Sequence, residues 1–312
     1  MTTMTVRKHS FLKDLVKNRT LWLMALPSIL IVLIINYVPM FGIGIAFQDF
    51  QFDKGLFRSP FIGFKNFEYF FSSGKALQLT FNTIGYNIAF LALNTFLEVV
   101  LAVVIFEMGG KRIKRVFQSA MILPYFISWI IIGGFVYNLL NYEYGAVNTF
   151  LATIGIEPIN AYSKPEAWLI ILPLVNAVQA VGFGSIIYLS AISGIDAEMY
   201  ESAYIDGAGF YRRVWHITLP MLLPTVVIMI LLSLGTVLRG NFEMFFPLIG
   251  NNGQLFKTTD VIDTYVFRTL VISSNSIGSA SAAGFYQQFI GLLIILGANR
   301  LVKKVAPSYE LF

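Results

Sequence analysis

The sequence has no cysteine, and charged residues make up only 12% of its 312 residues. Without cysteine, disulfides, thiolate zinc sites and cysteine nucleophiles are excluded. Soluble domains have roughly a quarter of their residues charged, whereas this chain is 56% hydrophobic and contains 29 phenylalanines. These proportions indicate an integral membrane protein. We interpret the net charge of +5 as a sign of membrane topology and not of nucleic-acid binding, because the basic residues form no dense patch.

Six segments are long and apolar enough to cross a bilayer as helices, which requires about 20 residues each. The predicted spans are residues 21–47, 79–106, 116–140, 167–192, 221–248 and 281–302. No linker or soluble domain separates them, so we expect a single transmembrane domain over residues 1–312. The first run is too long for the core of a signal peptide, and we expect it to remain as an anchor and span. The predicted fold class is therefore all-α integral membrane.

Lysine and arginine are unevenly divided between the two sides of these spans. Fourteen of the 22 basic residues lie before the first span, between the second and third, between the fourth and fifth, or at and after the end of the sixth. The positive-inside rule places these loops, and both termini, in the cytoplasm. The other loops are longer and carry aromatic and turn-forming residues, so they either cover the mouth of a pathway or only connect helices.

A polar island at residues 193–220 separates the fourth and fifth predicted spans and is far longer than a tight helix hairpin needs. Asp196 is placed to cap a short helix, and Glu198 adds negative charge to its first turn. Asp206 and Gly207 then form a turn in which the glycine takes a positive φ. We predict a second short helix over Phe210–Thr218, with a new helix beginning at Pro220.

Two placements of this island follow from its composition. An interfacial helix resting in the headgroups ordinarily carries many basic residues, whereas Glu198, Glu201 and Asp206 are acidic and are repelled by anionic lipid. Exposed aromatic and small residues at helical spacing instead suit insertion into a groove on a soluble partner. The acids favour this docking interpretation.

The island also resembles a known signature. Glu201-Ser202-Ala203, then Gly207, then Ile217-Thr218-Leu219-Pro220 follow the spacing E-A-A-x3-G-x9-I-x-L-P, with Ser202 in place of the first alanine. This is similar to the permease subunits of binding-protein-dependent ABC importers. The flanking Glu198-Met199-Tyr200 and Trp215-His216 resemble the carbohydrate-uptake branch that includes the maltose permease, as do Phe61-Ile62-Gly63-Phe64 and Leu123-Pro124-Tyr125. The resemblance covers all six spans.

The resemblance implies a type I ABC importer permease in a bacterial plasma membrane. It implies that the island is a helix-turn-helix loop coupling to a cytoplasmic ATPase, with Glu201, Ala203, Asp206, Gly207 and Gly209 at the contact. The chain lacks the G-x-x-x-x-G-K-[ST] phosphate loop, so ATP and Mg are expected on separate subunits. The implied partners are a second permease subunit forming a heterodimer, two ATPase subunits and an extracellular solute-binding protein.

Polar residues inside predicted spans are candidates for a sugar site, because unpaired polar groups are costly in a membrane unless they face a cavity. The candidates are Asn176, Gln179 and Phe183 on one face of the fourth span, Arg239 and Phe242 on the fifth, and Trp129 on the third. The family resemblance places Asn176 on a site asparagine, while the other residue types differ. Two alternatives stay open, because the amides also suit hydrogen bonds between helices and Arg239 also suits snorkelling to headgroups.

Glu98 is an acid about two turns inside the second predicted span. It is expected to pair with a neighbouring helix or reach the interface, although an ion-coupled secondary transporter would use such an acid. A membrane-embedded enzyme is disfavoured, because His9 and His216 are both predicted to be cytoplasmic and form no metal site or catalytic triad. The sequence therefore predicts a permease subunit that imports a sugar or oligosaccharide and is not itself an enzyme.

Overall fold

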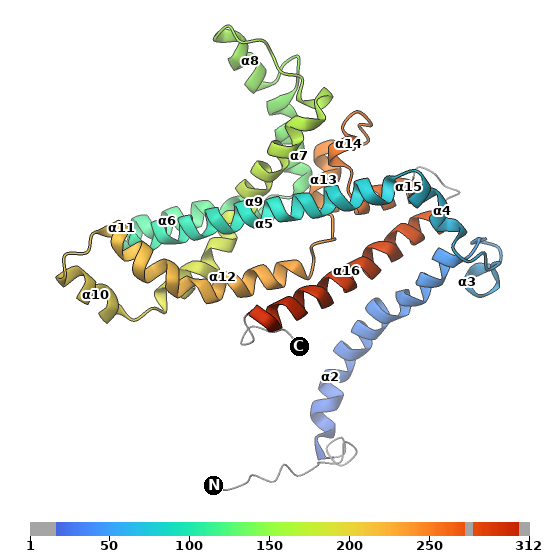
Figure 1. Cartoon of the computed structure of the whole chain (residues 1–312), viewed down its shortest axis with the longest axis horizontal. Coiled ribbons are helices and arrows are strands. Elements are labelled where there is room, and N and C mark those ends of the chain that lie inside the picture. Colours follow the sequence, from blue (N-terminus) through green and yellow to red (C-terminus); the bar gives the residue numbers. More distant parts are fainter. Residues whose placement is uncertain (1–16, 272–276, 306–312) are drawn as a thin grey trace.

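The computed structural model describes residues 17–271 and 277–305. Within these residues the chain is helical apart from turns and one isolated bridge between Gln48 and Phe61. Arg7, Lys8, Lys13 and both ends of the chain, which were used to predict orientation, lie outside the described residues. The predicted all-α membrane fold is confirmed (Figure 1).

Five helices in the described part of the chain are long and apolar enough to cross a membrane without a sharp bend. Two of them are single elements, α5 (Lys75–Glu107) and α16 (Ile277–Val305). The helix Arg19–Phe47 combines α2 (Arg19–Val32), η1 (Leu33–Tyr37) and η2 (Val38–Phe47), and the helix Pro165–Ser193 combines η5 (Pro165–Ala167) and α9 (Trp168–Ser193). The helix Phe210–Leu234 combines α11 (Phe210–Arg213), η6 (Val214–Thr218) and α12 (Leu219–Leu234). Shorter helices connect them. These are α3 (Gly55–Arg58), α4 (Lys65–Ser72), α8 (Ala146–Thr153), η4 (Ala161–Ser163), α10 (Ala197–Ile205), α13 (Phe242–Ile249), α14 (Phe256–Thr259) and α15 (Ile262–Val271).

The third predicted span, 116–140, is not one straight helix. It is formed by α6 (Lys111–Ile122) with η3 (Leu123–Phe126), followed by α7 (Trp129–Leu140), and the two parts meet at an angle of 94°. Pro124 lies just before the bend, where its fixed φ and missing N–H oppose a continuous helix. The segment still qualifies as a span if the bent pair is counted as one, but the bend itself was not predicted.

The fifth predicted span, 221–248, is also interrupted. Its helix begins earlier than expected, at Phe210, and ends at Leu234; residues 235–241 are non-helical before α13 begins at Phe242. The predicted helix over Phe210–Thr218 is present, and Pro220 lies in the first turn of α12, but the two are not separate helices. A π-helical turn at Val214–Thr218 instead joins α11 to α12 without a gap.

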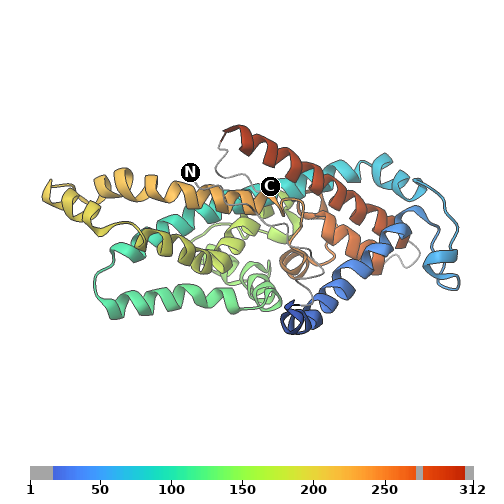
Figure 2. The same ribbon diagram turned by 90° about the horizontal axis from the view of Figure 1, so that it is seen from below.

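The helices pack around α5, whose partners change along its length. Near its beginning, Leu79 packs with Phe70 of α4 and Ala283 of α16. In the middle, Tyr86 and Phe90 pack with Trp168 of α9 and Phe245 of α13, and toward its end Ile105 packs with Ile192 and Leu222. The figures show α10 at one end of the molecule and α3 with α4 at the other (Figures 1 and 2). The helix α5 therefore connects the two ends.

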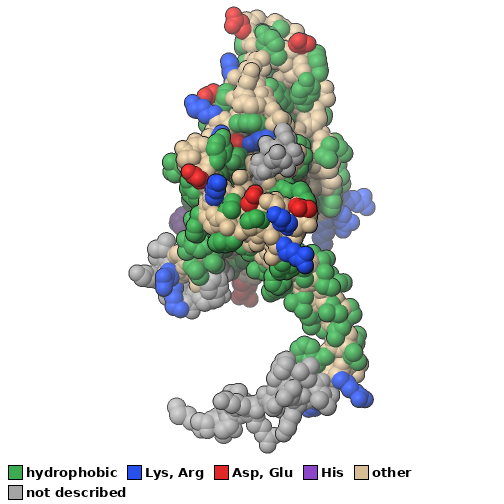
Figure 3. Space-filling view, turned by 90° about the vertical axis from the view of Figure 1, so that its right-hand side faces the viewer, with side chains coloured by type: hydrophobic (Ala, Val, Ile, Leu, Met, Phe, Trp, Pro, Cys, Tyr) green, Lys and Arg blue, Asp and Glu red, His purple; other side chains and the backbone are tan. Residues whose placement is uncertain are grey.

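The helix α2 stands apart from this bundle. None of its residues is buried, and hydrophobic side chains cover the arm that it forms below the body of the molecule (Figure 3). The arm is attached to the body where η2 ends. There the Asn66 Nδ2 of α4 donates to the carbonyls of Ala46 at 3.0 Å and Gln48 at 2.9 Å. The exposed apolar surface of α2 requires lipid or another subunit around it.

Candidate functional site

The bend between η3 and α7 is held by the fourth span. Gln179 of α9 donates a hydrogen bond from Nε2 to the carbonyl of Tyr125 at 3.3 Å. Gly182, one turn further along α9, lies against the backbone carbonyl of Met121, where a Cβ atom would collide with it. The close approach and the amide together stabilise an interruption that would otherwise leave backbone groups unpaired in the membrane.

Side chains from three helices hold the interruption at residues 235–241. Asn87 of α5 donates to the Arg239 carbonyl at 3.0 Å, and Gln287 of α16 donates to the Leu238 carbonyl at 2.7 Å. The Gly240 N–H donates to Asp263 Oδ2 of α15 at 2.6 Å. Burial raises the pKa of the Asp263 carboxyl, while the hydrogen bonds from Gly240 and Gln287 act in the opposite direction.

The two interruptions flank a cavity of about 750 Å³, which we call the wide cavity. Four of the six predicted substrate residues line it: Trp129, Asn176, Gln179 and Phe242. Further polar and aromatic lining residues were not among the predictions: Asn94, Tyr125, Ser128, Asn241, Glu243 and Phe246. Within the described residues, the lining thus combines amides, which donate and accept hydrogen bonds, with aromatic rings that offer flat apolar faces.

Phe183 and Arg239, the other two predicted substrate residues, do not line the wide cavity. The Phe183 ring instead stacks on Tyr125, with ring centroids 4.2 Å apart and an interplanar angle of 10°, so it supports a lining residue from behind. Arg239 is exposed and lines a different cavity, beside Gln287 and Gln288 of α16. The prediction that Arg239 binds substrate assumed a helix through residue 239. The interruption instead places the Arg239 side chain at the cavity beside α16.

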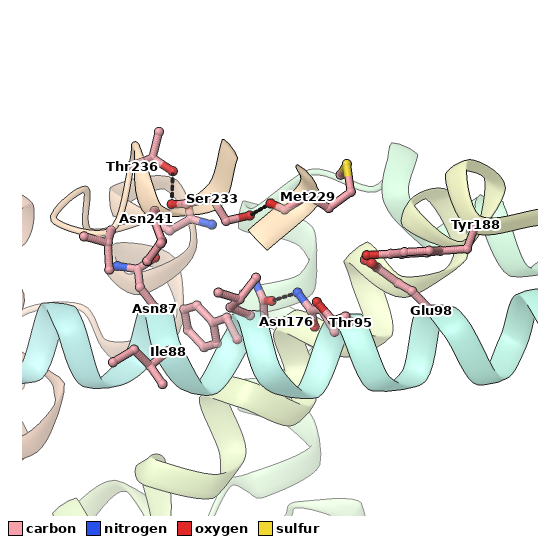
Figure 4. Close-up of a pocket in the computed structure, with 15 residues that line it drawn as sticks. Asn87, Ile88, Thr95, Glu98, Asn176, Tyr188, Met229, Ser233, Thr236 and Asn241 are labelled. Atoms are coloured by element: carbon pink, nitrogen blue, oxygen red, sulfur yellow. Dashed lines mark hydrogen bonds between the residues drawn. The ribbon is translucent and has the colours of Figure 1, made fainter. Parts of the chain in front are cut away.

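A second cavity of about 300 Å³, the narrow cavity, runs along α5 (Figure 4). It is lined by Asn87, Asn94 and Glu98 on one face of α5, by Asn176 and Tyr188 of α9, and by Ser233 of α12. Asn94 and Asn176 also line the wide cavity, and Asn94 Nδ2 donates to Asn176 Oδ1 at 2.8 Å. The spacing of Asn87, Asn94 and Glu98, at i, i+7 and i+11, was the sequence signal for this polar face.

The loop between the fourth and fifth spans forms the expected capped helix, α10. Asp196 accepts from the Glu198 N–H at 3.0 Å. At the other end Gly207 has φ 75°, its N–H donates to the Tyr204 carbonyl at 3.0 Å, and the Ala208 N–H donates to the Ala203 carbonyl at 2.8 Å. This is a Schellman motif, which requires a left-handed residue where Gly207 stands. The predicted turn with positive φ is confirmed.

Two polar contacts help to attach the loop to the bundle, and much of the remaining loop surface is exposed. The Tyr200 hydroxyl lies 3.0 Å from Thr218 Oγ1, and Arg213 forms an ion pair with Glu107 at the end of α5, with a distance of 3.1 Å. The predicted coupling residues Glu201, Asp206, Gly207 and Gly209 are exposed, and Ala203 is half-buried. Tyr204 and Ile205 beside them are 72% and 84% exposed, so the outer face offers apolar contacts.

No group of three or more histidine, aspartate or glutamate side chains that could hold a metal ion occurs in the part of the chain that the structure describes. The arrangement offers hydrogen bonding and stacking inside the membrane and an exposed helical loop at one end. It therefore suits binding and passage of a polar solute.

Comparison with known proteins identifies relatives along nearly the whole chain. Residues 99–307 match the family described as binding-protein-dependent transport system inner membrane component. The chain is 33% identical over 299 residues to the polygalacturonan/rhamnogalacturonan transport system permease protein YteP of Bacillus subtilis, a match that covers 96% of this chain and 92% of the relative. It is 27% identical to the trehalose/maltose transport system permease protein MalF of Thermococcus litoralis, over 83% of this chain and 86% of the relative.

Solved structures agree with these relatives. A chain in the crystal structure of a bacterial alginate ABC transporter, in complex with an alginate pentasaccharide-bound periplasmic protein, matches with a TM-score of 0.83 and 31% identity. The match covers 95% of this chain and 98% of that chain. The resemblance predicted from the sequence is confirmed.

Proposed function

The chain belongs to the family of binding-protein-dependent transport system inner membrane components, and on that premise we propose that it is the permease subunit of an ATP-driven importer of oligosaccharides. The observation that carries the proposal is the wide cavity, where two interrupted spans place Trp129, Gln179 and Phe242 around one space at membrane depth. Irregular backbone within a membrane is tolerated only where it is buried in protein or lines a cavity.

The substrate class follows from the lining and from the relatives. Amides and aromatic rings suit the hydroxyl groups and apolar faces of sugars, and the relatives are named for the transport of carbohydrates. Two of the named carbohydrates, polygalacturonan and alginate, are acidic. No lysine or arginine lines the wide cavity among the described residues, and Glu243 is acidic. We therefore propose that this cavity binds the hydroxyl groups of an oligosaccharide and not carboxylates.

Energy is proposed to come from two separate ATPase subunits that bind ATP and Mg and dock on the α10 loop. The exposed residues Glu201, Asp206 and Gly207 would form the contact, with Tyr204 and Ile205 filling an apolar groove. A second, different permease subunit would complete the pathway and cover part of α2, and an extracellular solute-binding protein would deliver the sugar. In this arrangement both termini lie in the cytoplasm of a bacterial cell.

The continuous helix Phe210–Leu234 provides the mechanical connection. It begins beside the α10 loop, which we call the docking loop, and ends where the interruption at residues 235–241 begins. A straight helix of this length spans about 37 Å, and a packed helix moves as a rigid element. A displacement imposed on the loop by nucleotide-driven closure is therefore delivered to the interrupted backbone beside the wide cavity.

The proposal is tested by reconstituting the chain with its partner permease, ATPases and binding protein in proteoliposomes. Uptake of radiolabelled oligogalacturonides, alginate oligosaccharides and maltooligosaccharides is measured with and without ATP. We expect ATP-dependent uptake of at least one of these sugars and none under an ion gradient alone. Sugar uptake driven by an ion gradient without ATPase subunits would contradict the proposal.

A further inference from the structure

The narrow cavity contains buried polar groups with few partners in the described chain. Asn94 Oδ1 is buried and has no hydrogen-bond partner, while the hydroxyl of Tyr188, which is 1% exposed, has only Thr95 beside it as a partner and makes no well-aligned hydrogen bond. Buried polar groups are ordinarily hydrogen-bonded. These groups lie around one space, which makes that space a candidate binding site.

Glu98 lies in the same cavity without a countercharge. None of the described lysine, arginine or histidine side chains forms an ion pair with it, and its carboxylate packs against Gly184 of α9, where a Cβ atom would displace it. The polar ends of Glu98 and Tyr188 lie next to one another (Figure 4). An acid kept at membrane depth without an ionic partner is a candidate functional group, because its desolvation is costly.

We propose that the narrow cavity is a second carbohydrate-binding station, in which Glu98, Tyr188 and Asn94 bind the hydroxyl groups of a sugar unit on its way inward. The proposal rests on the importer function given above. A carboxylate accepts hydrogen bonds from two hydroxyls, the amide oxygen accepts another, and the Tyr188 hydroxyl donates or accepts. The volume is at the lower limit of the roughly 300–1,000 Å³ typical of ligand pockets, which fits one or two sugar units.

The Glu98 end of the narrow cavity makes this a later station than the wide cavity. The narrow cavity follows α5 from Asn87 to Glu98, and its Glu98 end lies toward the end of α5 that is paired with Arg213 beside the docking loop. The two cavities share Asn94, Asn176 and Asn241, and the first two of these are joined by a hydrogen bond. Asn176 Nδ2 contacts Met244 Sδ at 3.5 Å, a weak interaction that is easily exchanged. Parting this asparagine pair would open the passage and free both amides for sugar.

The native chain has no cysteine, so single cysteines report on each cavity directly. In the complete importer in nanodiscs, Ser233→Cys probes the narrow cavity and Gln179→Cys the wide one, while Ser72→Cys, exposed at the end of α4, is the control. The rate of modification by a small hydrophilic methanethiosulfonate is measured with ATP. It is compared with and without whichever oligosaccharide of the three tested above is transported best.

We expect that reagent to modify both cavity cysteines, and the sugar to slow each modification several-fold without affecting Ser72→Cys. Protection of Gln179→Cys alone, or an unreactive Ser233→Cys, would overturn the second station and leave the proposed function standing. Protection at neither position, together with absent uptake, would instead contradict the proposed function.

A second variant tests the role of the carboxylate. In the Ser233→Cys background, Glu98→Gln keeps the size of the side chain and removes the charge. Hydrogen bonds to charged groups are stronger than neutral ones, so we expect about tenfold more sugar to be needed for half-protection of Ser233→Cys. When Glu98→Gln is instead combined with Gln179→Cys, the sugar concentration for half-protection should change less than about twofold. Equal changes at both positions, or none at either, would show that Glu98 does not bind sugar in the narrow cavity.

Discussion

The docking loop and the wide cavity adjoin opposite ends of one helix, Phe210–Leu234, yet different kinds of interaction build them. The loop is defined by neighbours in sequence, since Asp196 caps α10 and Gly207 ends it within the same short segment. The cavity depends on partners far apart in the chain, such as Asn87 with Arg239 and Gln179 with Tyr125. Local backbone chemistry therefore forms the loop that we propose docks on ATPase subunits, and tertiary packing forms the cavity that we propose binds sugar.

The largest expected effect comes from Gly207→Val in the loop. A side chain in the left-handed conformation costs about 1–2 kcal/mol, and more when β-branched. Because each 1.4 kcal/mol shifts a population tenfold, we expect ATP-driven uptake to fall about tenfold or more while the protein still inserts in the membrane. Uptake and membrane content are measured in parallel in proteoliposomes.

Gly155→Val is the matched control for this substitution. Gly155 follows α8 with φ 76° and the same pair of hydrogen bonds, from Gly155 N–H to Ala152 and from Ile156 N–H to Leu151. It carries equal local strain away from the loop and is expected to retain most uptake. Equal losses in the two variants would mean that backbone strain alone, and not docking, explains the effect of Gly207→Val.

Much of the loop, and little of the interruptions, could be predicted from the sequence. Asp196, Gly207 and the signature beginning at Glu201 are read within a short window, so the prediction needed no tertiary information. The bend after Pro124 and the break at residues 235–241 occur within long, predominantly apolar segments of the sequence. Their backbone groups are satisfied by Asn87, Gln179 and Gln287 on other helices, which no local pattern shows.

The same distinction explains part of the outcome for the predicted site residues. Asn176 and Gln179 lie on α9, which is continuous as predicted, and both line the wide cavity, whereas Phe183 on the same helix stacks on Tyr125 behind it. Arg239 was placed by continuing a helix through an interruption, and it lines another cavity. Gly235 and Gly240, with polar residues between and beside them, were the available signals of that interruption.

Packing at the wide cavity is tested by two adjacent glycines of α7. A Cβ on Gly133 would lie 2.7 Å from the Pro247 carbonyl oxygen of α13, whereas a Cβ on Gly134 meets nothing within 4 Å. We expect Gly133→Ala to destabilise the protein by about 1–3 kcal/mol through overpacking, and Gly134→Ala to be neutral or stabilising by up to ~1 kcal/mol. Thermal unfolding in detergent measures both. Similar melting temperatures would contradict the α7–α13 contact.

Substitutions of Gln179 and Arg239 are expected to affect sugar binding differently. Gln179→Ala removes a lining amide, and the loss of one hydrogen bond of about 1 kcal/mol raises the half-saturating sugar concentration about fivefold. Arg239→Ala is expected to change it less than about twofold, because the side chain lines a different cavity. Sugar-stimulated ATP hydrolysis is the readout. A larger shift for Arg239→Ala would restore its predicted role and contradict the placement found here.

The smallest effect concerns the pH dependence of the interruption. Because the pKa of Asp263 is raised by burial, the folded state holds this proton more tightly than the unfolded chain. Its contribution to stability is therefore fully present below the ordinary pKa of 3.8 and is lost as the pH rises through the raised pKa. Asp263→Asn should remove this decline, so the melting temperature of the wild type should fall relative to that of the variant as the pH rises through the raised pKa. A difference in melting temperature that does not change with pH would contradict a raised pKa at Asp263.

We propose that the sugar binds between the two interrupted spans. A cryo-electron microscopy map of the complete importer, held before ATP hydrolysis with the transported oligosaccharide bound, would test this most directly. We expect sugar density in the wide cavity, in contact with Trp129, Gln179 and Phe242. Density that avoids these residues and lies against Arg239 and Gln288 of the neighbouring cavity would contradict it.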